Sequence, residues 1–317
     1  MSMQIRPQDM PEVRAELTTW NTTQGPGYFT ACVAKGQQTV YHDAPNAEAA
    51  GHWFANTEDD RLAKAELFYV TREMTELVVA AARSMPTWSL APEDLPAPRG
   101  LIYFDGLTDF RNLPTTAMTW GPCPQAVVDW CGLKSSGLWL SHYVDAGDLA
   151  HVFTRKGISA PPLLYGSESL CAFGEQESGN VSFYRDPDTR DVIESNTQDL
   201  IGRVGSLVVA KAAWLLMQQG IAECVDVSPD RAARKRLARA GHQPRPVRVI
   251  ELRRPKTTST HGDSDRQYHH RWITRGHWRQ QWYPARQVHR PVWIAPHIKG
   301  PEGAPLIGGE KVYALKR

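Results

Sequence analysis

The stretch from Gly100 to Val144, GLIYFDGLTDFRNLPTTAMTWGPCPQAVVDWCGLKSSGLWLSHYV, decides the predicted fold. Turn residues divide it into four strand-like segments: Gly100–Asp105, Thr115–Trp120, Ala126–Trp130 and Leu138–Val144. Short strands at this spacing favour an antiparallel meander over alternating βαβ units.

Two long helices are predicted to pack on this sheet. Apolar residues recur at helical spacing through Glu58–Arg83, and they surround nearly the whole circumference of Leu200–Gln219. The second pattern is typical of a buried helix. Near the N-terminus, Tyr28–Ala34 and Gln38–Tyr41 are predicted to form a β-hairpin. The expected fold class is therefore α+β, a mainly antiparallel sheet packed by two long helices.

Charge divides the chain into two regions. Residues 228–317 contain 20 Lys and Arg against 6 Asp and Glu, whereas residues 1–227 contain 16 against 28. We therefore expect an acidic α+β body at 1–227 and a basic His/Arg/Trp-rich module at 228–317. Within the module we expect a helix at 229–240, a strand at 247–252 and a small β-hairpin at 268–300. The asymmetry indicates a polyanionic partner, nucleic acid before membrane, or docking of the module on its own body.

The motifs that mark several large enzyme classes are missing from the sequence. It contains no Walker A loop, no G-x-G-x-x-G and no G-x-S-x-G, so no nucleotide or dinucleotide cofactor is expected. The five widely spaced cysteines include no CxxC, and the N-terminus has no apolar signal core. A reducing, cytoplasmic setting without membrane insertion is expected.

In the segment Leu138–Asp145, strand alternation puts Ser141 and Tyr143 on the face opposite His142. These residues therefore do not form a preassembled triad. A hydrogen-bonded histidine within the sheet is the favoured interpretation of His142.

The most unusual composition lies in the hairpin, where His, Arg and Trp alternate. If Trp272–Arg279 is extended, one face is largely cationic and the other largely aromatic. Arg offers planar donors to phosphate, and Trp stacks on unpaired bases. This mixture fits single-stranded or structured RNA or DNA better than groove reading. The predicted nucleic-acid-binding residues are Arg271, Arg275, Trp278, Arg279, Trp282, Arg286, Arg290 and Lys299.

Two alternatives use the same region. His277 and His297 form the acid–base pair of a ribonuclease-type toxin if the strands bring them together beside a cation. Alternatively, the module is a non-catalytic surface that recognises an acidic protein. The histidines lack nearby cysteines and any HExxH spacing, so no metal site is predicted.

Two motifs near the C-terminus carry a resemblance. Arg275-Gly276-His277-Trp278-Arg279 and the segment Trp293–Pro301 resemble a family of uncharacterised proteins from actinobacteria and their phages or plasmids, which end in an RGHWR…VWI-PH-KGPE-APL pattern. The resemblance covers roughly the last 90 residues and extends less firmly to Asp94–Trp120. It implies a mobile-element or host-defence setting, and it supplies no activity and no catalytic residue.

Overall fold

The computed structural model describes residues 5–34, 44–86, 88–107, 115–131, 136–147, 153, 159–174, 182–185, 192–195, 204–253, 269–301 and 304–305. Its helices are α1 (Met10–Thr23), α2 (Gly25–Ala34), α3 (Ala47–Lys64), α4 (Arg72–Arg83), α5 (Gln125–Cys131), α7 (Val204–Met217) and α8 (Arg231–Arg239). The main strands are β1 (Glu66–Val70), β2 (Gly100–Phe104), β3 (Ala117–Pro122), β4 (Gly137–Asp145), β5 (Leu163–Ala172), β8 (Ala222–Val227) and β9 (Val247–Leu252). The smaller strands are β6 (Ser182–Arg185), β7 (Val192–Ser195), β10 (Trp272–Thr274), β11 (His277–Tyr283), β12 (Val288–Ile294) and β13 (His297–Lys299).

A seven-stranded sheet in the order β5-β4-β3-β2-β1-β9-β8 forms the centre of the fold. Strands β2, β3 and β4 match three of the predicted strands, and β5, which was not predicted from the sequence, extends them into a four-stranded antiparallel meander. Strand β8 pairs antiparallel with β9. Strand β1 pairs parallel with both β2 and β9. The fold is therefore α+β with a mainly antiparallel sheet, as predicted.

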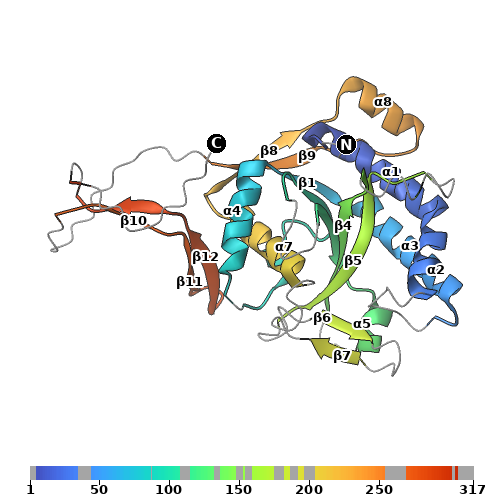
Figure 1. Cartoon of the computed structure of the whole chain (residues 1–317), viewed down its shortest axis with the longest axis horizontal. Coiled ribbons are helices and arrows are strands. Elements are labelled where there is room, and N and C mark those ends of the chain that lie inside the picture. The colour runs from blue at the N-terminus through green and yellow to red at the C-terminus, as the bar shows by residue number, and fades with distance from the viewer. Residues whose placement is uncertain are drawn as a thin grey trace.

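Helices cover both faces of this sheet (Figure 1). Helices α1, α2 and α3 bury their apolar side chains against one face, and α4 and α7 bury theirs against the other. The two cores contain large aromatic side chains such as Trp139 on the first face and Trp120 and Trp214 on the second. Burial of this apolar area is the dominant favourable contribution to folding.

The single helix predicted over Glu58–Arg83 is wrong. Strand β1 interrupts it and separates α3 from α4. Leu67 and Tyr69 face the core under α1–α3, while Phe68 and Val70 face the core under α4 and α7. A strand buried on both faces shows no alternation of polar and apolar residues. The apolar residues of β1 therefore fitted the helical spacing of the flanking segments, and the three elements were predicted as one helix. The unit β1–α4–β2 is thus a parallel βαβ crossover beside the meander.

Two predicted strands are helices. Ala126–Trp130 lies in α5, and Tyr28–Ala34 lies in α2, so the predicted N-terminal hairpin is wrong; its second strand, Gln38–Tyr41, lies outside the described residues. Proline fits the first turn of a helix, where no intrahelical donor is required. In α5 the carbonyl of Pro124 accepts from the backbone N–H groups of Val127 and Val128 at 2.9 and 3.1 Å.

The basic region begins inside the body. Strand β9, predicted at 247–252, lies between β1 and β8 in the main sheet. Helix α8 is capped by Asp230, whose carboxylate accepts from the N–H of Ala233 at 2.7 Å. Arg236 of α8 donates to Glu12 of α1 at 2.6 Å. The change of charge at residue 228 therefore does not separate two sheets.

A polar cluster is buried between α3 and the meander. Glu58 accepts hydrogen bonds from Thr119 and Ser141, both at 2.7 Å, and from the Tyr143 hydroxyl. The guanidinium of Arg61, one turn later in α3, lies 3.2 Å from Oε2 of Glu58, the same oxygen that accepts from Ser141. Burial and the Glu58 carboxylate raise the pKa of Tyr143, so its phenol stays protonated and donates. Because both carboxylate oxygens accept hydrogen bonds, we interpret the cluster as structural: it fixes α3 to strands β3 and β4.

We expect Glu58→Ala to destabilise the protein by roughly 3 to 5 kcal/mol, because it leaves a buried guanidinium without its carboxylate. Urea unfolding monitored by tryptophan fluorescence measures the loss. The control is Glu48→Ala in the first turn of the same helix, where the side chain is exposed and the effect should stay within about 1 kcal/mol. Equal losses in the two variants would contradict the structural role of the cluster.

His142 lies on the opposite face of the sheet from Glu58 and is fully buried. Its Nε2 lies 2.8 Å from the Ser169 hydroxyl, while Nδ1 has no hydrogen-bond partner among the described residues. Burial lowers the pKa of His142 from 6.5 to about 4. Strand alternation separates it from Ser141 and Tyr143 as predicted, and these residues form no triad.

The depressed pKa of His142 predicts acid sensitivity. Between pH 6.5 and about 4, His142 binds a proton in the unfolded chain but stays neutral in the folded protein. The free energy of unfolding therefore falls as the pH falls through this window. His142 should change the free energy of unfolding by about 1.4 kcal/mol per pH unit within this window. Urea unfolding at pH 7, 6 and 5 should show this slope in the wild type and a reduced slope in His142→Gln. His52→Gln, at an exposed position, should leave the slope unchanged.

Candidate nucleic-acid interface

Residues 269–301 form the hairpin unit, a long antiparallel pair of strands with one break. Trp278 of β11 lies opposite Trp293 of β12, and Ile273 of β10 lies opposite Ile298 of β13. At the break, a Cβ on Gly276 would lie 2.4 Å from the Trp293 ring, so this position requires glycine. The small β-hairpin predicted at 268–300 is confirmed by these pairings.

One face of the hairpin unit docks on the body. Trp293 is 7% exposed and belongs to the core formed by α4 and α7. Its ring lies 5.3 Å from that of Trp278, whose indole N–H donates to the carbonyl of Ala81 in α4 at 2.8 Å. The backbone N–H of Trp293 donates to the side chain of Gln219 at 3.0 Å. We call this face, which includes Trp278, Trp282, His289 and Trp293, the inner face.

Two of the predicted phosphate-binding arginines are engaged within the chain. Arg290 forms an ion pair with Asp94, a buried carboxylate that also accepts from the backbone N–H of Ala91. Arg286 lies 3.9 Å from Glu93, and both of these side chains are half exposed. Burial lowers the pKa of Arg290, and Glu93 opposes the shift. Self-docking of the basic region on the acidic body therefore accounts for Arg290 and partly for Arg286.

Three other predicted cations are exposed. Arg275, Arg279 and Lys299 form no ion pair with any residue that the structure describes. Arg279 donates only to the amide oxygen of Gln281 at 2.8 Å. Arg271 differs, because it is half-buried and its Nε donates to the carbonyl of Ala304 at 2.7 Å. The hairpin unit thus keeps three cations available to an external anion.

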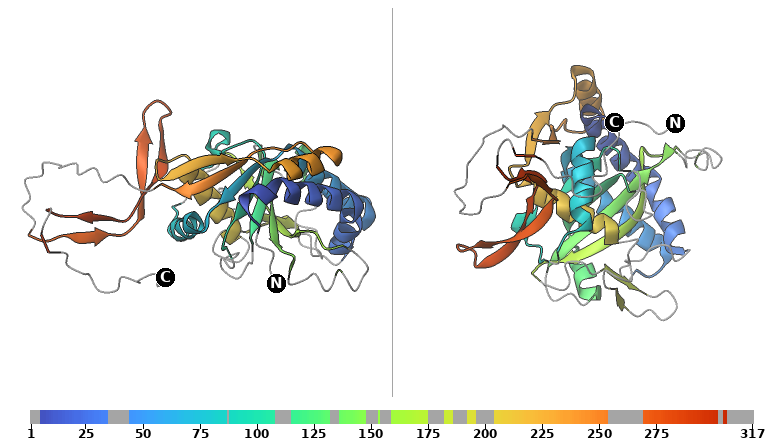
Figure 2. Two further views of the ribbon diagram at one scale, coloured as in Figure 1. Left: turned by 90° about the horizontal axis from the view of Figure 1, so that it is seen from above. Right: turned by 60° about the vertical axis from the view of Figure 1, so that its left-hand side comes forward.

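Apolar side chains are also exposed here. Among the described residues, seven large apolar side chains are exposed, and five of them lie in the hairpin unit: Ile273, Trp282, Tyr283, Val288 and Ile298. The unit extends away from the body beyond α4 (Figure 2). Concentrated exposed apolar area of this kind marks a binding surface.

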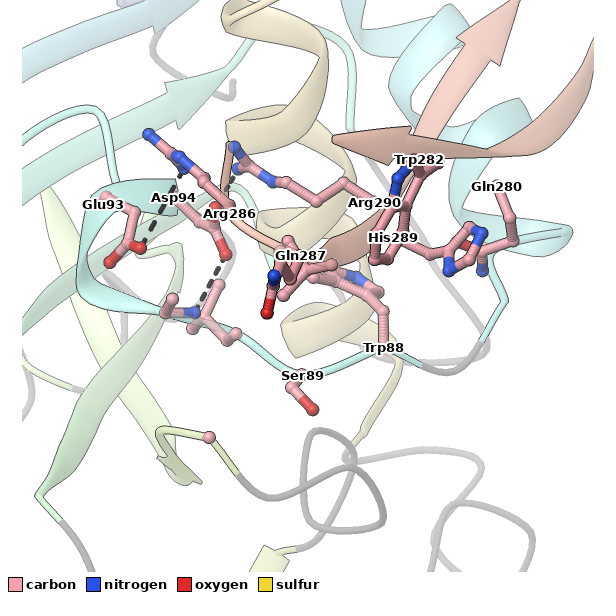
Figure 3. A pocket seen from close by; sticks show the side chains of 14 residues that line it. Trp88, Ser89, Glu93, Asp94, Gln280, Trp282, Arg286, Gln287, His289 and Arg290 are labelled. Carbon is pink, nitrogen blue, oxygen red and sulfur yellow. Dashed lines mark hydrogen bonds and ion pairs between the residues drawn. The ribbon is translucent and has the colours of Figure 1, made fainter. Parts of the chain in front are cut away.

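An open groove lies where the hairpin tip overhangs the body. Its volume is about 1250 Å³. One wall is the segment Trp88–Asp94, and the other comes from β11, the turn and β12. Trp282, His289 and Gln280 gather at one end, and Glu93, Asp94 and Arg286 lie at the other (Figure 3). The Trp282 and His289 rings are 4.8 Å apart.

The predicted acid–base histidines lie on different two-stranded sheets. His277 is opposite Ile294, and His297 is opposite Thr274. Each Nδ1 lies about one hydrogen-bond length from the carbonyl two residues earlier, 3.1 Å to Arg275 and 3.0 Å to Ala295. No hydrogen bond joins the two rings within the described part of the chain. This arrangement offers no support for an acid–base pair formed by His277 and His297.

Two other kinds of site are not found in the part of the chain that the structure describes. Across the described ranges, no group of three or more His, Cys, Asp or Glu side chains is placed to hold a metal ion. No described helix has the length and apolar character needed to cross a membrane.

The groove wall at Trp88–Asp94 was not predicted from the sequence. The sole available signal was Glu93-Asp94 beside Trp88, a pattern too common to be specific. Comparisons with protein-family models, with curated proteins and with solved structures find no match to the chain. The function proposed below therefore rests on the geometry of the site itself.

We expect Asp94→Ala to loosen the hairpin unit, because Arg290 loses its buried carboxylate. The free energy of unfolding should fall by roughly 1.5 to 3 kcal/mol, and the amides of β12 should exchange faster with deuterated solvent. Glu93→Ala is the matched control, since its pair with Arg286 is exposed and longer and should contribute at most about 1 kcal/mol. A control that loosens β12 as much as Asp94→Ala would refute the special role of Asp94.

Proposed function

We propose that the protein binds nucleic acid, single-stranded or structured RNA or DNA, through the hairpin unit. The observation that carries this proposal is the combination, on a projecting pair of strands, of an exposed tryptophan ring with three cations that form no ion pair among the described residues. In this proposal Arg275, Arg279 and Lys299 contact the phosphates, and the exposed Trp282 ring stacks on a base. Proteins that bind single strands combine these two kinds of contact.

The charge distribution supports a polyanion over a small anion. The free cations occur in β11, in β13 and at the break between β10 and β11, so they are spread along the length of the hairpin unit. A single phosphate cannot reach all of them, whereas a chain with a phosphate on every nucleotide contacts several at once. The resemblance of this segment to proteins of phages and plasmids fits such a partner in a mobile-element or host-defence setting.

An acidic protein is the second candidate partner. The exposed cross-strand neighbours Ile273 and Ile298, 46% and 55% exposed, favour it because apolar pairs of this kind are common at protein interfaces. Nucleic acid remains the first choice, because the same strands carry cations and stacking rings together.

Filter binding of RNA and DNA oligonucleotides over a salt series tests the proposal. The logarithm of the affinity should fall linearly with the logarithm of salt concentration, and Arg275→Ala/Arg279→Ala/Lys299→Ala should reduce that slope by about 2 for single strands. The control Arg6→Ala/Arg72→Ala/Arg248→Ala removes the same charge from arginines already paired with carboxylates, and should change the slope much less. Absence of binding even at low salt would refute the proposal and leave the acidic protein first.

A further inference from the structure

The groove between the hairpin tip and Trp88–Asp94 differs chemically from the exposed cations of the hairpin unit. Its charged end contains two cations and two carboxylates, and these face one another as Arg290 with Asp94 and Arg286 with Glu93. This end is therefore close to neutral. It has little attraction for phosphate, which the carboxylates would repel.

The other end of the groove is aromatic and polar. Trp282 is 44% exposed although it belongs to the inner face, whose other tryptophans, Trp278 and Trp293, are packed against the body. The inner face extends beyond the edge of the body, and Trp282 is the ring left uncovered there. His289, directly opposite in the strand register, lies against it, which limits the positions that the indole can adopt.

The neighbouring polar groups suit a base edge. Gln280 lies two residues before Trp282 on the same face of β11, and Gln287 lies in the turn with a positive φ of 52°. A glutamine amide offers both donors and an acceptor, which match the mixed donors and acceptors of an unpaired base. The volume of about 1250 Å³ is ample for one or more nucleotides, since ligand pockets commonly measure about 300 to 1,000 Å³.

We infer that this groove holds an unpaired nucleobase, stacked on Trp282 and contacted at its edge by glutamine amides, while the phosphates stay on the exposed cations. The inference rests on the proposed function and deepens it, because it makes the protein selective for single strands. A paired base inside a duplex cannot leave its partner to enter the groove without the cost of unstacking and unpairing.

The test uses an RNA or DNA oligonucleotide with a single 2-aminopurine, as a free strand and as a duplex with its complement. Wild-type protein should bind the single strand more tightly and quench the 2-aminopurine fluorescence by stacking. Trp282→Ala should abolish the quenching and weaken single-strand binding by about 10- to 100-fold, the range expected for one lost stacking contact. Its effect on duplex binding should be less than about twofold.

Tyr283→Ala is the matched control. Tyr283 follows Trp282 in β11, is similarly exposed at 38% and points to the opposite face, so the quenching should persist. Trp282→Phe, which keeps an aromatic face, should retain most of the affinity and shows that loss in the alanine variant is not a folding defect.

The outcomes separate the two proposals. If the triple cation variant weakens binding but Trp282→Ala affects single strand and duplex equally, the groove inference is overturned and the proposed function stands. Unquenched 2-aminopurine in the wild-type complex likewise overturns the groove inference alone. If the wild-type protein binds neither form at low salt, both are overturned.

Discussion

The insertion of Trp293 into the core beneath α4 and α7 is the contact on which the functional surface depends. This buried indole, in edge-to-face contact with Trp278, holds the hairpin unit against the body. The glycine at 276 is required because any side chain there would collide with the same ring. With the inner face held in this way, strand alternation decides which residues meet the body and which meet solvent.

The charge asymmetry of the sequence has two explanations, and each applies to different residues. Arg290 and Arg236 neutralise carboxylates of the body, Asp94 and Glu12. Arg275, Arg279 and Lys299 have no such partner among the described residues. Composition alone cannot separate these groups, because it counts charges without their neighbours.

The local spacing of apolar and polar residues predicted part of this structure, and it failed at strand β1, which is buried on both faces. Strands β2, β3 and β4 of the meander, the strand at 247–252 and the hairpin at 268–300 could be predicted from alternation and turn residues, whereas β5 was not predicted. Strand β1 could not, because its run of Leu, Phe, Tyr and Val is buried on both sides and continues the spacing of the flanking helices. Helix α2 begins at Gly25 and has Pro26 in its first turn, and α5 begins just after Pro124. These residues looked like interruptions, although proline also fits a first turn.

The groove was beyond prediction for a different reason, which also bears on how it works. Its two walls are almost 200 residues apart in the sequence, and contacts that include the docking of Trp293 and the Asp94–Arg290 pair bring them together. That pair has a second consequence. By placing carboxylates at one end of the groove, the body cancels the attraction that arginines there would exert on phosphate. Exposed cations are left on the strands of the hairpin unit, and the aromatic end of the groove is where we propose that an uncharged, flat group binds. Separate locations for phosphate and base are what a protein needs in order to discriminate an unpaired strand from a duplex.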